Sequence, residues 1–184
     1  IVFAVNSNLW PNVFRLGQVT VNGQPAVSAD LSGQWLTVGL SQTLSPGDTI
    51  KIGISYTLSL PYSSAKVENF GYTSRQTNLI DWYPFIPPFK NGNWQLPAPY
   101  GFGENLVYEK ADFYINLVFA DPSNQPVVAA STLPTVNNGS YQYELANARN
   151  FSFSFSPDYL VTSTNVGDVQ VYNYVFPEDA AAGA

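Results

Sequence analysis

Any catalysis by this sequence would have to come from carboxylate, lysine, serine or tyrosine side chains, because its 184 residues contain no histidine and no cysteine. The closest group of carboxylates is Glu104, Glu109 and Asp112. A glycosidase needs two carboxyl groups about 5–9 Å apart across a cleft. Glu104 and Asp112 would share one face of an extended strand, but they would lie too far apart to act on one bond. Solvated carboxylates at the start of a strand are the simpler interpretation, and a carboxylate-only hydrolase stays as an alternative.

The missing residue types exclude several classes of site. Without histidine there is no HExxH zinc site and no Ser-His-Asp or Cys-His triad, and without cysteine there is no thiolate nucleophile or iron–sulfur cluster. Seven basic residues stand against 13 acidic ones, for a formal net charge of −6, which argues against nucleic acid and anionic membranes as partners. The sequence contains no run of 18 apolar residues, so it predicts no membrane-spanning segment. The compartment is not indicated.

Aromatic and proline residues gather between positions 61 and 103. The prolines remove backbone donors, so we expect a long ordered loop held by aromatic packing rather than a set of central strands. Its aromatic side chains could pack against a neighbouring domain, or Trp82, Trp94 and Tyr100 could form a platform that binds carbohydrate or protein. The candidates for interdomain packing are Trp82, Tyr83, Phe85, Phe89, Trp94 and Tyr100.

Alternating apolar residues and turn signals predict β-structure on both sides of this loop. Asn22-Gly23 and Asn137-Asn138-Gly139 are hairpin turns between such runs. The runs at 49–56 and 111–119 place every second, apolar side chain on one face, and Phe151, Phe153 and Phe155 continue the pattern as expected core residues. The sequence therefore predicts an all-β fold, an antiparallel β-sandwich or saddle-like curved sheet with one long Pro/aromatic-rich loop.

The order of these segments resembles the N-terminal β domain of the M1 (gluzincin) family of zinc metallo-aminopeptidases. The matching pieces occur in the family's order, as LSPGDTIKIGISY at 44–56, WYP at 82–84, GE at 103–104, ADFYINLVFADP at 111–122, VVAAS at 127–131 and ARNFSFSFSPDY at 148–159. The WYP form is similar to a bacterial branch of the family. The resemblance implies a domain at 1–178 and, at 179–184, a linker toward a catalytic domain that the chain does not contain.

The resemblance also implies what the parent protein does. In the family, zinc is held by HExxH and a downstream glutamate, and a GxMEN-type segment binds the free amine of the substrate; both belong to the catalytic domain. This chain would then be non-catalytic, with its own C-terminal catalytic domain and a peptide substrate as partners. Gln76 occupies roughly the place of a family residue that helps to hold the substrate amine, although a surface glutamine without a special role is the simpler interpretation. A stand-alone binding module with exposed aromatics is the alternative function.

Overall fold

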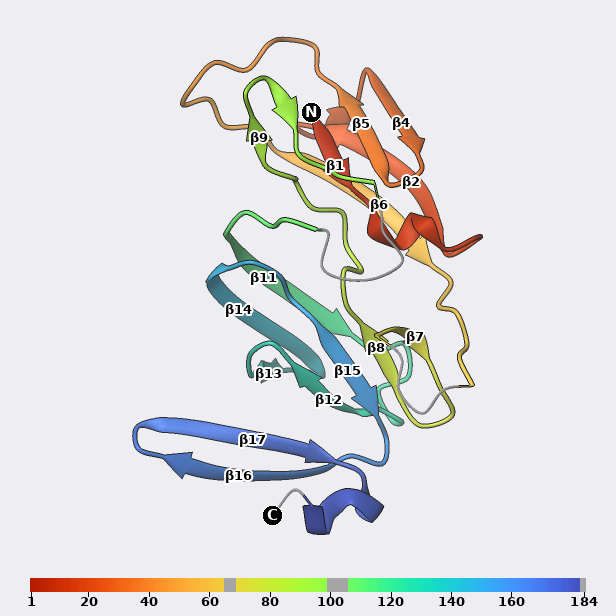
Figure 1. Ribbon diagram of the computed structural model, residues 1–184, viewed down its shortest axis with the longest axis vertical. Coiled ribbons are helices and arrows are strands. Elements are labelled where there is room, and N and C mark those ends of the chain that lie inside the picture. The colour runs from red at the N-terminus through yellow and green to blue at the C-terminus, as the bar shows by residue number, and fades with distance from the viewer. Residues whose placement is uncertain (65–68, 99–105, 183–184) are drawn as a thin grey trace. The chain divides into compact units, whose positions relative to one another are not determined.

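The computed structural model describes residues 1–64, 69–98 and 106–182 of the chain. Nearly all regular structure is β-strand, arranged in antiparallel sheets, so the predicted all-β fold is confirmed (Figure 1). The chain divides into two compact units. Unit 1 contains Ile1–Pro61 and Asp81–Ala111, and unit 2 contains Tyr62–Ile80 and Asp112–Ala184. Within the described residues, no helical segment has the length and hydropathy needed to cross a membrane.

Unit 1 is built on two three-stranded sheets, ordered β1-β5-β4 and β3-β2-β6. The first six strands are β1 (Val2–Ala4), β2 (Phe14–Val21), β3 (Gln24–Pro25), β4 (Ser28–Ser32), β5 (Trp35–Gly39) and β6 (Ile52–Leu58), with a 3-10 turn η1 (Asn6–Leu9) between β1 and β2. Residues from both sheets, together with Val5 just after β1, form one hydrophobic cluster, namely Phe3, Val5, Phe14, Val19, Leu36 and Val38. Ile52, Ile54 and Tyr56 pack against this cluster, as the alternation of the 49–56 segment predicts.

Unit 2 contains a three-stranded sheet β11-β14-β13, a four-stranded sheet β12-β15-β8-β7 and a two-stranded ribbon of β16 and β17. Its strands are β7 (Phe70–Tyr72), β8 (Thr77–Leu79), β11 (Ala111–Val118), β12 (Val127–Ala130), β13 (Thr135–Asn137), β14 (Ser140–Ala148), β15 (Phe153–Ser156), β16 (Leu160–Val166) and β17 (Val169–Val175), followed by a 3-10 segment η2 (Pro177–Ala182). Phe151 and Phe153 are buried, which confirms them as core residues, and Phe155 is half-buried.

Both predicted hairpin turns are present, and their backbone explains the residues used. Asn22 and Gly23 join β2 to β3 with φ values of 51° and 81°, and Asn138 and Gly139 join β13 to β14 with φ values of 48° and 77°. These values place both residues of each turn in the left-handed region, which asparagine and glycine adopt at little cost.

The expectation that residues 61–103 contain no central strand is wrong. β8 pairs with β15 on one side and β7 on the other, so it is an interior strand of the four-stranded sheet. The prolines of the region stand at 61 and from 84 onward, so the backbone donors of 77–79 remain free to pair. The irregular stretch is therefore shorter than the 61–103 region that we expected. It also contains a small hairpin formed by β9 (Phe89–Lys90) and β10 (Asn93–Trp94).

Tyr143, on β14, shows how closely the unit 2 core is packed. The residue is 1% exposed, and its ring lies edge-on against Phe151 and Phe153, with centroids 5.6 and 5.3 Å away. Its buried hydroxyl has no hydrogen-bond partner among the described residues. Burial, followed by the charges of Tyr141 and Tyr174, raises the pKa of Tyr143 to about 12. Its neutral form is thus the one that the fold stabilises.

We therefore expect Tyr143→Phe to stabilise the protein at pH 7 by about 1 kcal/mol, because the substitution removes an unsatisfied buried hydroxyl and keeps the ring. Between about pH 10 and 12 the tyrosine ionises only in the unfolded protein, so ionisation lowers the free energy of unfolding as the pH rises. The variant has no such hydroxyl, so this part of the pH dependence should be absent from it. Urea unfolding at pH 7 and 10.5 measures both effects. Tyr114→Phe, at a 76% exposed position on β11, is the control. A less stable Tyr143→Phe variant at pH 7 contradicts the prediction.

Candidate functional site

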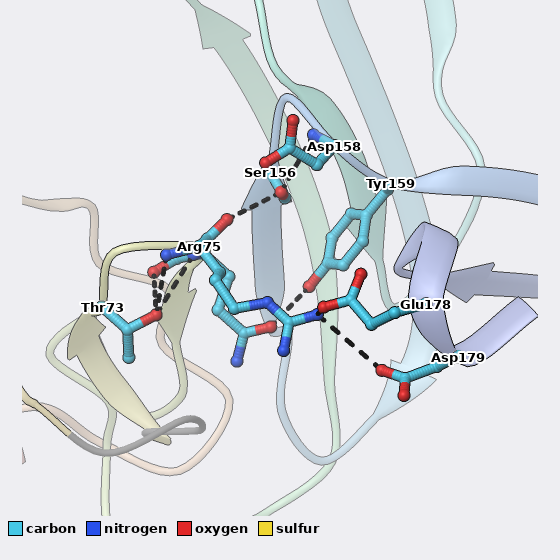
Figure 2. Close-up of polar contacts among 8 residues, drawn as sticks. Thr73, Arg75, Ser156, Asp158, Tyr159, Glu178 and Asp179 are labelled. Carbon is cyan, nitrogen blue, oxygen red and sulfur yellow. Dashed lines mark hydrogen bonds and ion pairs between the residues drawn. The ribbon is translucent and has the colours of Figure 1, made fainter.

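A cluster of polar side chains forms in unit 2 around the turn between β7 and β8. The turn is closed by a hydrogen bond from the Thr73 amide to the Gln76 carbonyl oxygen at 2.8 Å. The Thr73 hydroxyl oxygen accepts hydrogen bonds from the amides of Arg75 and Gln76 at 3.1 and 3.2 Å. Threonine side chains stabilise turns in this way. The turn therefore holds the main chain of Arg75 and Gln76 in a fixed orientation, and Figure 2 shows Thr73 beside Arg75.

Gln76 is buried, and its side chain reaches the segment after β15. The hydroxyl of Tyr159 donates to Oε1 of Gln76 at 3.0 Å and lies 2.6 Å from Oγ of Ser154. Ser154 also contacts Oδ1 of Asn78, on β8. Gln76, Tyr159, Ser154 and Asn78 thus form a row of hydrogen-bonded side chains, which we call the Gln76 relay.

The Gln76 relay has too few hydroxyl protons for its contacts. Tyr159 and Ser154 each carry one proton, whereas the row contains three hydrogen bonds, so an amide at one end must supply the third. Which atom of each terminal amide faces the hydroxyl is set by this network. If Asn78 donates, the Gln76 nitrogen is the atom left for another partner; if Gln76 donates, its oxygen is left. Gln76 can therefore offer either a donor or an acceptor to a further partner.

Arg75 connects the same turn to the C-terminal segment. Its guanidinium carbon lies 3.6 Å from the centroid of the Phe176 ring. Its Nη2 lies 2.5 Å from Oε1 of Glu178 and 3.7 Å from Oδ2 of Asp179, both in η2. A planar guanidinium can stack on an aromatic ring and pair with carboxylates at its edge. These contacts dock η2 on the β7–β8 turn (Figure 2).

Ser156, at the end of β15, holds the main chain of this turn. Its hydroxyl donates to the carbonyl oxygen of Arg75 at 2.7 Å and accepts from the amide of Asp158 at 3.1 Å. Ser156 is 1% exposed, so this link is protected from water. An open groove of about 530 Å³ runs beside the cluster, lined by Arg75, residues 157–160 and residues 176–178. The groove has the size of a small-ligand pocket, with polar groups of both charges at its edge.

The candidate aromatic residues lie in unit 1 and differ in their exposure. Phe85 is buried with Ala4 and Leu96, and Tyr83 packs partly against this cluster. Trp82 is half-buried, with its ring edge-on to that of Tyr83. In the short hairpin β9–β10, Phe89 is 59% exposed and Trp94 is half-buried, with ring centroids 4.8 Å apart and planes inclined by 57°. Tyr100 lies outside the described residues.

Phe89 and Trp94 border an open groove of unit 1. It has a volume of about 720 Å³, and its other walls are Ile1 and residues 37–44. Because the two rings are inclined to each other, they do not form a flat stacking platform.

The candidate carboxylates do not form a described pair. Glu104 lies outside the described residues, and the exposed Asp112 uses Oδ1 to accept a hydrogen bond from the amide of Asn147 at 2.8 Å. Among the residues that the structure describes, no group of three or more acidic, histidine or cysteine side chains could hold a metal ion.

Sequence reasoning proposed Gln76 as a candidate but missed the residues that contact it. Tyr159 lies 83 positions away in the sequence, and Ser156 lies 81 positions from Arg75. Ser156 and Tyr159 both lie in the segment 148–159, which resembles part of the M1 pattern. This resemblance was the signal that could have drawn attention to them. A single sequence does not show that this segment pairs with β8.

The comparisons with known proteins identify a similar fold. No protein-family model matches the sequence, and no curated protein matches it significantly. Among solved structures, the M1 zinc metallopeptidase from Deinococcus radiodurans is similar over 95% of this chain, with 17% identity and a TM-score of 0.52. A mutant of that enzyme is similar over the same share, with 16% identity and a TM-score of 0.50. This chain spans 38% of the length of each.

The docking of η2 by Arg75 can be measured by a double-mutant cycle of Arg75→Ala and Glu178→Ala. We expect a coupling energy of about 0.5–1 kcal/mol at low salt, because the ion pair is partly exposed, and a smaller one at 1 M salt. Chemical unfolding of the four proteins gives this value. The control cycle combines Arg75→Ala with Asp158→Ala, because the Asp158 carboxylate makes no described contact with Arg75. Equal coupling in the two cycles contradicts the specific role of Glu178.

Proposed function

We propose that this chain is the non-catalytic N-terminal domain of an M1-type zinc aminopeptidase, in which it caps the catalytic domain and shapes the peptide entrance. The observation that carries the proposal is the agreement between two independent features. The segments that resemble the M1 pattern occur in the family's order, and the fold is similar to an M1 zinc metallopeptidase over 95% of the chain. The chain spans only 38% of that protein, which leaves room for a catalytic domain.

The zinc site would belong to the following domain. The family's HExxH ligands cannot come from these 184 residues, which contain no histidine. A zinc ion bound in that domain would polarise the scissile carbonyl and lower the pKa of a bound water. The residues of this chain would bind and orient the peptide and restrict access of water to the site. The parent activity would be the removal of N-terminal residues from peptides.

Gln76 is the residue that we assign to substrate binding. A substrate with a free N-terminus presents an ammonium group, which needs an acceptor. Oε1 of Gln76 accepts from the Tyr159 hydroxyl with one of its two lone pairs, and the second lone pair is the acceptor that we assign to the ammonium group. The relay would hold the amide in this orientation, so that binding of the amine does not require the side chain to be ordered first.

The exposed hydrophobic residues of unit 1 support the capping role. Phe89 is 59% exposed and Ile86 is 45% exposed, and both lie in the proline-rich stretch. We assign them, with the half-buried Trp82 and Trp94, to packing against the catalytic domain. Phe85 already packs inside unit 1. The alternative function, a stand-alone binding module, would use the groove beside Phe89 and Trp94.

The proposal is tested first on the coding sequence and then on the full-length protein. We expect an HExxH motif, with a glutamate about 20 residues later, in a domain that follows residue 184. The purified full-length protein should release N-terminal residues from peptides, lose this activity with a chelator and regain it with zinc. A reading frame that stops without such a domain contradicts the proposal and favours the binding module.

The role of Gln76 predicts a specific kinetic change in the full-length enzyme. Gln76→Ala should lower kcat/KM for peptides with a free N-terminus by about tenfold or more, because a hydrogen bond to a charged amine is lost. Tyr159→Phe should have a smaller effect, since it removes the hydroxyl from the relay and leaves the amide in place. Steady-state kinetics with peptides that have a free N-terminus measures both changes.

The matched control is a second tyrosine–glutamine pair of unit 2. The Tyr141 hydroxyl donates to Oε1 of Gln125 at 2.6 Å. Gln125→Ala and Tyr141→Phe remove a similar hydrogen bond and should leave kcat/KM unchanged. If the Gln76 and Gln125 variants behave alike, Gln76 has no substrate role.

A further inference from the structure

The ribbon of β16 and β17 has a face with mostly apolar side chains, which we call the apolar face, and a face with mostly polar ones, which we call the polar face. The strands pair from Leu160 with Val175 at the base to Val166 with Val169 at the tip, and Gly167, with a φ of 60°, opens the two-residue turn. Directly paired residues share a face, and faces alternate along each strand. One face carries Leu160, Thr162, Thr164, Val166, Val169, Val171, Asn173 and Val175. The other carries Val161, Ser163, Asn165, Gln170, Tyr172 and Tyr174.

Unit 2 itself covers part of the polar face. Tyr172 and Tyr174 are half-buried, and the Tyr174 ring lies 6.2 Å from that of Tyr159. Burial raises the pKa of Tyr174, with a further contribution from Tyr172. These contacts lie at the base of the ribbon. The polar tip, at Asn165 and Gln170, is exposed.

The apolar face has no such cover toward its tip. Val166 is 66% exposed, Val169 is 63% exposed and Val171 is 42% exposed. A two-stranded ribbon is marginally stable in water unless one face packs against something. The segment 160–175 contains a single charged residue, Asp168, in the turn. Depletion of charge is typical of the buried centre of an interface, whereas free surfaces are rich in charged residues.

The base of the ribbon is where the chain continues. β17 ends at Val175, and Phe176 and η2 follow at once, held by the stacked and paired guanidinium of Arg75. Figure 1 shows the ribbon and η2 meeting at this point. If the proposed function is right, the catalytic domain follows η2 and starts beside the ribbon. A seven-residue strand spans about 23 Å, so the ribbon can reach across a substantial part of that domain.

We infer that the apolar face of the β16–β17 ribbon docks on the catalytic domain that follows this chain. The inference rests on the proposed function, and it adds a second contact to the one assigned to the aromatic stretch of unit 1. The ribbon would carry the contact through Val166, Val169 and Val171, while Asn165 and Gln170 stay in water. The docked η2 would fix the base from which the ribbon projects.

Cysteine labelling of the full-length protein tests this contact. Residues 1–184 contain no cysteine, so Val169→Cys and Gln170→Cys each place one thiol in the ribbon, on opposite faces. We expect the thiol at position 169 to react with a maleimide at least about tenfold more slowly than the thiol at 170. The rate is followed by mass spectrometry of the peptide that spans 160–175, so that cysteines elsewhere do not interfere. Equal rates overturn the inference.

A pair of charge variants gives a second readout on the same protein. Val166→Lys with Val169→Lys changes a directly opposed pair on the apolar face, and Asn165→Lys with Gln170→Lys changes the neighbouring pair on the polar face. Both add the same charge next to the turn. The apolar-face pair should lower the thermal midpoint of the full-length protein by several degrees more than the polar-face pair. Equal midpoints count against the contact.

The outcomes separate this inference from the proposed function. Zinc-dependent aminopeptidase activity with equal labelling at 169 and 170 overturns the ribbon contact and leaves the function standing. A reading frame without a catalytic domain overturns both. Slow labelling at 169 that becomes fast on dilution identifies a second copy of the chain as the occupant, which also overturns the inference.

Discussion

The antiparallel pairing of β8 with β15 is the constraint on which the candidate site depends. Ser154 pairs with Asn78 and Phe155 with Thr77, so two segments about 75 positions apart are aligned residue by residue. This register places Gln76 beside Tyr159 and the carbonyl of Arg75 beside Ser156. A slip of one residue would turn every side chain of β15 to the opposite face. The buried Phe153 opposes such a slip, because it would then leave the core.

The sequence predicted those parts of the fold that depend on local patterns. Alternation located β6 and β11, and the asparagine–glycine turns located two hairpins, because a left-handed backbone strongly selects these residues. β8 was missed because three residues are too short to show a period, and its place in the sheet depends on partners distant in sequence. The same limit applies to the site. Gln76 could be proposed from a resemblance, but Tyr159 and the docking of η2 on Arg75 follow only from the fold.

Some polar contacts of the site join residues that are close in the sequence, and others join residues that are far apart in it. Thr73 stabilises its own turn within three residues, whereas Ser156 and Tyr159 fix the same turn from across the sheet. A turn held by its own side chain alone would move with its exposed tip. Because the buried Ser156 binds the backbone of Arg75, the orientation of both Arg75 and Gln76 is tied to the rigid sheet. This is the arrangement that a binding residue requires, since preorganisation lowers the cost of binding.

The composition limits what such a site contributes to a reaction. With neither histidine nor cysteine, the chain has no side chain whose ordinary pKa lies between 5 and 8. Gln76, Tyr159 and Ser154 are neutral hydrogen-bonding groups, and the charge of Arg75 is paired with Glu178. Such residues can orient a substrate through hydrogen bonds and ion pairs. If the proposed function is right, the pH dependence of the full-length peptidase should therefore originate in its catalytic domain and in the amine of its substrate.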